Sequence, residues 1–160
     1  MIRRQDLAQL LLRLALGAGF LLAVADRFGF LGGPGSKGVS WGNWANFAGY
    51  THTLLPFLSG GLASVMAGIA TGLEIVFGVC LVIGLGVRLA AAGAALLTLI
   101  FGLCMAVFLG IRAPFGYPVF VFTGAAWVLA TLSSYRWSVD ELFNSRTHPR
   151  RHHRRNERGY

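Results

Sequence analysis

Two ionisable side chains stand inside long apolar stretches, and their type and position suggest chemistry. Arg13 lies within the apolar run 7–28, and Glu74 is the only charged residue of the run 59–86. An ionisable group at the centre of a membrane helix costs roughly 2.5 to 3.5 kcal/mol, so such groups are usually paired or functional. We therefore predict that Glu74 and Arg13 belong to a catalytic or ligand-binding site.

Glu74 is expected near the middle of its span and inside the protein. It is twelve residues from Gly86, which corresponds to about 18 Å along a helix. Its neighbours on the same helical face are all small, and faces of small residues pack against other helices. They are Ala67, Ala70, Thr71 and Gly78. A proton-carrying or ligand-binding role is one interpretation of this position, and it is compatible with a pair between Glu74 and Arg13.

Arg13 allows two interpretations. It lies about six residues into its helix, roughly 9 Å deep, and its long side chain reaches either Glu74 or the cytoplasmic headgroups. Side chains lean toward the N-terminus of their helix, which takes Arg13 toward the cytoplasm and Glu74 toward the outside. A direct pair would thus require the two helices to be offset.

Other reactive side chains do not form a site. Cys80 and Cys104 are expected to differ in depth by about 13 Å, which exceeds disulfide reach, so both are interpreted as core residues. His148, His152 and His153 have no second cluster to complete a metal site, so none is predicted. The sequence has neither a CxxC motif nor a Gly-rich phosphate loop after a strand, so no intrinsic cofactor is expected.

The elements that must position these residues are apolar segments long enough to cross a bilayer. The run 89–111 has 23 residues without a charge, and as a helix it would measure roughly 35 Å. A spanning segment must be helical, because unpaired backbone groups in lipid cost several kcal/mol each. We predict an all-α membrane protein, a bundle of four transmembrane helices over about 7–28, 60–86, 89–111 and 117–135. The last helix should begin near Pro118.

The outer segment 29–58 is too long for a turn and contains a patterned piece. Ser40 is a plausible N-cap, and Trp41, Trp44, Phe47 or Ala48, and Thr51 then recur at helical spacing. This pattern predicts a short amphipathic helix on the outer leaflet, with its tryptophans at headgroup level. A lid over a pocket that opens to the outside is the alternative.

The charge distribution predicts the topology. The chain of 160 residues has a net charge of +8, and its body between Leu7 and Tyr135 has only four Arg and one Lys, so nucleic-acid binding is not expected. Short loops rich in Lys and Arg stay in the cytoplasm, which places both termini there. Residues 1–140 form the predicted membrane domain, and 141–160 a basic disordered tail drawn to anionic lipid.

A cleaved signal peptide is a second interpretation of the first span. Arg3 and Arg4 would be its basic region, and residues 23–25, Ala-Val-Ala, its cleavage site. Arg13 in the middle of the apolar region speaks against it.

The segments "LLRLALGAGFLLAVADRFG" and "GLEIVFGVCLVIGLGVRLAAAGAALLTLIF" resemble the DoxX family of bacterial four-helix membrane proteins. The family is related to the DoxD subunit of thiosulfate:quinone oxidoreductase, and the resemblance covers about residues 9–135. Arg13, Glu74 and Arg88 match its recurrent charged positions. Asp26 and Arg27 stand where many members have His-Gly followed by Lys. The resemblance implies a bacterial inner-membrane location and an association with quinone-linked redox processes.

The leading functional hypothesis is an accessory subunit of a membrane oxidoreductase, whose bundle binds quinone while a soluble redox partner supplies electrons. An intrinsic quinone-reducing enzyme would have to borrow its redox centre. Two hypotheses from other classes stay open: a small proton-coupled carrier that uses Glu74, and an assembly or scaffold protein that binds partners through small-residue helix faces.

Overall fold

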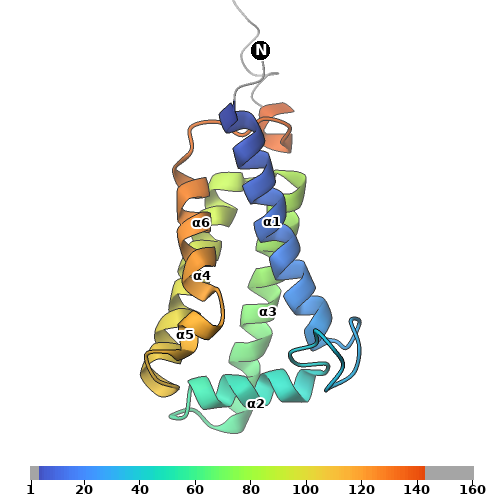
Figure 1. The fold of residues 1–160 in the computed structure, drawn as a ribbon, viewed down its shortest axis with the longest axis vertical. Coiled ribbons are helices and arrows are strands. Elements are labelled where there is room, and N and C mark those ends of the chain that lie inside the picture. Colours follow the sequence, from blue (N-terminus) through green and yellow to red (C-terminus); the bar gives the residue numbers. More distant parts are fainter. Residues whose placement is uncertain (1–3, 143–160) are drawn as a thin grey trace, which may run out of the picture.

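The computed structural model describes residues 4–142, and within that range it is helical with no strand (Figure 1). The predicted basic tail lies almost entirely outside the described residues. The helices in chain order are α1 (Arg4–Arg27), α2 (Trp44–Leu54), α3 (Gly60–Ile83), α4 (Val87–Phe108), α5 (Ala113–Gly116) and α6 (Val119–Thr131).

Three helices, α1, α3 and α4, are long and apolar enough to cross a membrane, with 24, 24 and 22 residues. They indicate a multi-pass helical membrane protein. The region predicted as a fourth span, 117–135, holds the apolar helix α6, which begins directly after Pro118 as expected. With 13 residues, α6 is about 20 Å long, shorter than a hydrocarbon core of about 30 Å.

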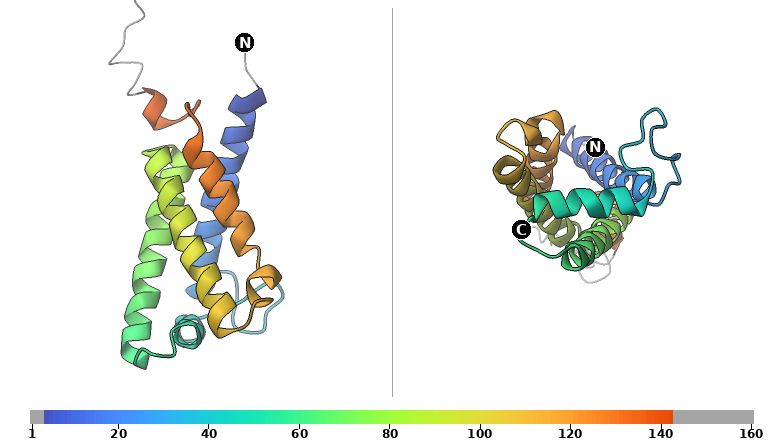
Figure 2. Two further views of the ribbon diagram at one scale, coloured as in Figure 1. Left: turned by 90° about the vertical axis from the view of Figure 1, so that its left-hand side faces the viewer. Right: turned by 90° about the horizontal axis from the view of Figure 1, so that it is seen from below.

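The four main helices form an up-down bundle. Successive members run in opposite directions, with the start of α1 and the end of α6 at one end and α2 at the other (Figures 1 and 2). α1 packs against α3, α3 against α4, and α4 against α6, while α6 also contacts α1. Short connections account for this order, because the turn between α3 and α4 spans only residues 84–86.

Small residues let these helices approach closely. The buried face of α4 includes Ala90, Ala91, Ala94 and Ala95, and it packs against α6. At Gly17 on α1, an added Cβ atom would lie 2.9 Å from the backbone oxygen of Gly78 on α3. The side of α3 that was expected to face the bundle is indeed buried at Ala67, Thr71, Glu74 and Gly78.

α2 crosses the end of the bundle instead of extending it (Figure 2). Its N-cap is Asn43, whose side chain accepts from the Asn46 backbone N–H at 2.8 Å, so the predicted cap at Ser40 is wrong. Ser40 cannot serve because its backbone N–H is engaged by Asp26, which holds this part of the chain in a loop. The inward face of α2 is Phe47, Thr51 and Leu54, at helical spacing.

The close approach of α1 and α3 at Gly17 generates a stability prediction. Gly17→Ala should lower the free energy of unfolding by about 1–3 kcal/mol, because the methyl group overlaps the α3 backbone and Val82. Gly72→Ala is the matched control on α3, where an added Cβ meets nothing within 4 Å. That change should be neutral or stabilising by up to about 1 kcal/mol, owing to helix propensity. Thermal unfolding in detergent, followed by circular dichroism, measures both, and equal effects would contradict the packing described.

Candidate functional site

A bidentate ion pair between Arg27 and Glu74 is the central polar feature of the bundle. Arg27 Nη2 donates to Glu74 Oε1 at 3.0 Å, and Arg27 Nη1 lies 2.6 Å from Glu74 Oε2. Both side chains are only 6% exposed. Two parallel contacts between a guanidinium and a carboxylate fix orientation as well as distance. The pair therefore joins the end of α1 rigidly to α3.

Two further residues complete the surroundings of Arg27. Its Nη1 also donates to the Thr71 hydroxyl at 2.9 Å, and Thr71 lies on the same face of α3 as Glu74. The guanidinium carbon is 3.7 Å from the centre of the Phe47 ring on α2. A cation over an aromatic face is attracted by the ring quadrupole. One side chain thus connects α1, α2 and α3.

The partner of Glu74 differs from the sequence-based expectation. The sequence suggested Arg13, yet Arg27 is the residue that pairs with Glu74. The lean of side chains toward the N-terminus of their helix explains the choice, because it moves Glu74 toward the α2 end of the bundle and Arg27 into the bundle to meet it. The sequence contained this signal, because the same lean of side chains argued against a pair between Arg13 and Glu74.

Asp26, adjacent to Arg27, organises the loop that leads to α2. Its carboxylate accepts the backbone N–H groups of Ser40 and Trp41 at 3.0 Å each and of Gly42 at 3.2 Å. Asp26 is buried, so these contacts replace the water that it would otherwise bind. Asp26 therefore fixes the residues that precede α2, including Trp41.

Arg13 lies at the opposite end of the bundle and neither pairs with Glu74 nor extends to the surface. It is 2% exposed, and its Nη2 donates to the Trp137 carbonyl oxygen at 2.7 Å. Trp137 adopts a φ of 54°, a left-handed conformation that is uncommon outside glycine. The segment after α6 covers Arg13, so the two predicted site residues are not brought together.

The same segment is anchored at several points. Arg136 Nη1 donates to Asp6 Oδ2 at 3.1 Å, and Gln9 donates to the Arg136 carbonyl at 2.9 Å. Asp140 accepts the backbone N–H groups of Gly86 and Val87 at 2.7 and 2.9 Å, which caps the start of α4. Arg13 thus helps to hold the segment after α6 over this end of the bundle.

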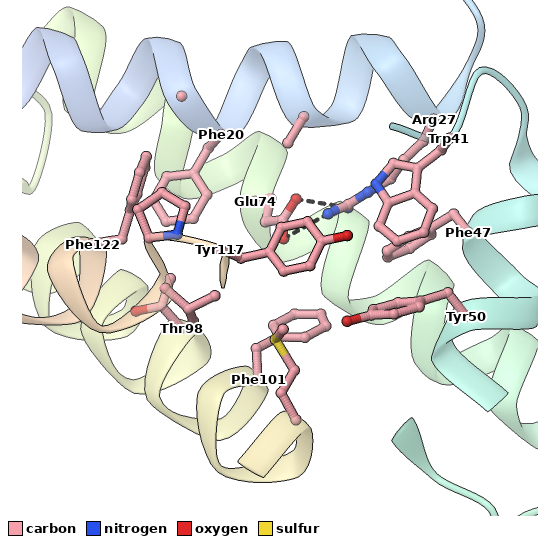
Figure 3. Close-up of a pocket in the computed structure, with 15 residues that line it drawn as sticks. Phe20, Arg27, Trp41, Phe47, Tyr50, Glu74, Thr98, Phe101, Tyr117 and Phe122 are labelled. Carbon is pink, nitrogen blue, oxygen red and sulfur yellow. Dashed lines mark hydrogen bonds and ion pairs between the residues drawn. The ribbon is translucent and has the colours of Figure 1, made fainter. Parts of the chain in front are cut away.

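A cavity of about 230 Å³ opens beside the Arg27–Glu74 pair (Figure 3). It lies among α1, α2, α3, α4 and the start of α6, and aromatic side chains form much of its wall. The lining residues are Gly19, Phe20, Ala23, Arg27, Trp41, Phe47, Tyr50, Glu74, Thr98, Phe101, Met105, Tyr117, Pro118, Val119 and Phe122. Apolar cavities with a few placed polar groups are the usual form of a small-molecule site.

Sequence reasoning missed most of this cavity. The tryptophans of segment 29–58 were predicted at headgroup level, whereas Trp41 lines the cavity together with Phe47. The residue pattern of this segment predicts a helix, but it does not predict how that helix lies relative to the bundle. α2 crosses this end of the bundle, and its Phe47 and Tyr50 line the cavity.

A second cavity, of about 180 Å³, lies among α2, α3 and α4. Its lining is almost wholly apolar and includes Leu54, Ile69, Leu97 and Cys104. Phe101 lines both cavities.

The cysteines do not add a reactive centre. Cys80 and Cys104 are both free and partly buried, in agreement with the prediction that they do not form a disulfide. Over residues 4–142, no group of three or more potential metal ligands comes together. The histidines proposed and rejected as metal ligands, 148, 152 and 153, lie outside that range.

Comparison with known proteins returned no relative: no protein-family model, curated protein or solved structure matches the chain. The fold defines the class of a multi-pass helical membrane protein, and the site rests on the geometry of the ion pair and its cavity.

The buried pair generates a second prediction. Arg27→Met should lower the free energy of unfolding by about 3–5 kcal/mol, because it leaves Glu74 buried without its counter-charge. The double change Arg27→Met with Glu74→Leu should recover most of this loss, since apolar side chains can replace a buried pair. Thermal unfolding in detergent measures both, and a double variant no more stable than Arg27→Met would contradict this account.

Proposed function

We propose that this chain is a DoxX-like protein of the bacterial inner membrane that binds a quinone in the aromatic cavity, as an accessory subunit of a membrane oxidoreductase. The observation that carries the proposal is the combination of aromatic walls with a buried, internally neutral ion pair. A quinone headgroup is a flat, uncharged ring, and such a ring gains most from aromatic surfaces that exclude water.

The proposal includes a topology. α6 with its flanking residues forms the fourth span, α2 lies at the outer surface, and both termini are cytoplasmic. Arg88 and Arg136 then face the cytoplasm, in accord with the preference of Lys and Arg for that side. The cavity accordingly opens near the outer leaflet, where α2 crosses the bundle.

The second cavity favours a lipid-soluble ligand. A membrane quinone carries an isoprenoid chain, and that chain needs an apolar path away from the ring. The groove beyond Phe101 adjoins the headgroup cavity and has an almost wholly apolar lining. Ring and chain would thus find adjacent sites of suitable polarity.

Electron transfer in this proposal depends on another protein. The chain has no cofactor-binding motif, so the quinone needs an external donor, and a soluble redox partner on the cytoplasmic face or at the outer surface would supply it. The chain itself would hold and orient the ring.

A proton-coupled carrier based on Glu74 is the second candidate, because a buried carboxylate in a membrane helix is the usual proton site. Both carboxylate oxygens of Glu74 are in contact with Arg27, so loading a proton would require those contacts to open. This geometry favours a structural role for the carboxylate. The third hypothesis, an assembly factor, relies on small-residue faces, and those at Gly17 and Gly78 are used within the bundle.

Quinone content tests the proposal directly. Protein purified from bacterial membranes in mild detergent should yield bound quinone on solvent extraction, measured by liquid chromatography. Ala23→Phe, which fills the cavity, should lower the yield at least fivefold, because the new ring occupies the binding space. Val121→Phe is the control on the exposed side of α6, with 70% exposure, and should retain quinone. Equal yields from both variants, or none from the parent protein, would refute quinone binding here.

Glu74→Gln separates the carrier from the proposed function. If Glu74 completes a buried pair, the change should lower the amount of folded protein and its thermal stability, because Arg27 loses a charged partner. A carrier would instead lose proton-coupled uptake in vesicles while its abundance stayed normal. Western blotting of membranes together with a pH-sensitive dye in vesicles distinguishes the two outcomes.

A further inference from the structure

The polar groups that line the cavity can be sorted by whether the protein already uses them. Both Nη atoms of Arg27 and both carboxylate oxygens of Glu74 are engaged in their mutual contacts, and Thr71 takes another Arg27 donor. The two charges sum to zero. The ion pair therefore presents no net charge to a ligand, although Arg27 Nε has no hydrogen-bond partner and Glu74 Oε2 has only its ionic contact with Arg27.

Thr98 is also satisfied within the protein. Its hydroxyl lies 2.9 Å from the Ala94 carbonyl oxygen and 2.9 Å from the Thr123 hydroxyl. Thr123 in turn donates to the Val119 carbonyl at 3.1 Å. Because a hydroxyl has one proton, which Thr98 gives to α4, this residue has no donor left for a ligand.

Besides the indole N–H of Trp41 and the Nε–H of Arg27, two tyrosine hydroxyls of the lining remain without a partner among residues 4–142. Tyr50 comes from α2 and Tyr117 from the connection between α5 and α6, and both line the cavity. Neither hydroxyl has a hydrogen-bond partner among residues 4–142. Figure 3 shows them reaching the cavity from different sides, with the Tyr50 hydroxyl directed toward Phe101 and the Tyr117 ring in front of the ion pair.

The two phenols lie close enough to influence each other. Burial raises the pKa of Tyr50, and the neighbouring Tyr117 raises it further. Tyr50 thus stays protonated at physiological pH and acts as a hydrogen-bond donor. Tyr117 is 48% exposed and stands at the mouth, where a ligand would replace water.

We propose that Tyr50 and Tyr117 are the residues that hold the quinone, each donating a hydrogen bond to a ring oxygen, and that the cavity rejects anionic redox substrates such as sulfur oxyanions. This inference rests on the proposed quinone-binding function and assigns its specificity. Phe20, Phe101 and Phe122 supply the apolar surfaces around the ring. Arg27 and Glu74 are positioning residues, which hold α1, α2 and α3 around the cavity.

The rejection of anions follows from the charge balance. Arg27 and Glu74 are the only charged residues of the lining, and they neutralise each other. An anion entering this cavity would lose its hydration without gaining an unpaired cation, which is strongly unfavourable in apolar surroundings. An uncharged ring with acceptor oxygen atoms meets no such barrier.

The test uses decylubiquinone as the probe and the full-length protein in detergent. Isothermal titration calorimetry should show that Tyr50→Phe and Tyr117→Phe each raise the Kd by roughly threefold to tenfold, the effect of one lost neutral hydrogen bond. Tyr135→Phe is the matched control, because the Tyr135 hydroxyl donates to the Leu129 carbonyl at 2.9 Å and does not line the cavity. This control should leave the Kd unchanged.

A spectroscopic readout separates direct contact from an effect on the fold. A carbonyl that accepts a hydrogen bond absorbs at a lower infrared frequency, so each Tyr→Phe change should shift one carbonyl band of bound quinone to higher frequency. Millimolar thiosulfate should neither displace decylubiquinone nor alter the melting temperature beyond an equal ionic strength of chloride.

The outcomes are distinguishable. If the parent protein binds decylubiquinone but the two tyrosine variants match it in Kd and carbonyl frequency, the tyrosine assignment is wrong and the proposed function stands. Displacement of the quinone by thiosulfate would overturn the charge argument. If the parent protein does not bind decylubiquinone at all, the proposed function fails together with this inference.

Discussion

The bidentate contact between Arg27 and Glu74 determines how the helices meet at the end of the bundle that contains the cavity. Both charges are buried, and separating them would leave each without compensation in apolar surroundings. Arg27 ends α1 and Glu74 lies within α3, so the contact sets how these helices meet and from which point the chain must turn toward α2. The Phe47 ring on the guanidinium then brings α2 to the same place.

Asp26 and Arg27 are adjacent in the sequence, but their side chains contact different parts of the protein. Arg27 points into the bundle to Glu74, while Asp26 gathers the backbone N–H groups of residues 40–42. Together they bind the loop and the bundle to the last turn of α1. Trp41 and Phe47 are thereby held over the cavity, so its aromatic wall depends on two charged residues.

The two ends of the bundle use buried arginines differently. At the far end, Arg13 holds the carbonyl of Trp137 and helps the segment after α6 to close over the helix ends. At the other end, Arg27 supports a cavity with aromatic walls and two free phenols. A buried arginine is consequently no sufficient sign of a ligand site: Arg27 lines a cavity with aromatic walls, whereas Arg13 holds a segment of the chain.

Sequence alone determined that the main helices of this protein are long and apolar enough for a lipid bilayer. Long uncharged runs can be read directly from the residues, and the rise per residue of a helix gives their length. It also placed Glu74 inside the bundle, since the small residues around it mark a packing face. Only the tertiary structure decided that Arg27, and not Arg13, pairs with Glu74, that Asn43 starts α2, and that α2 covers a cavity. The reason is physical: helical periodicity defines which residues share a face, whereas the offset between helices and the path of a loop depend on contacts between segments distant in sequence.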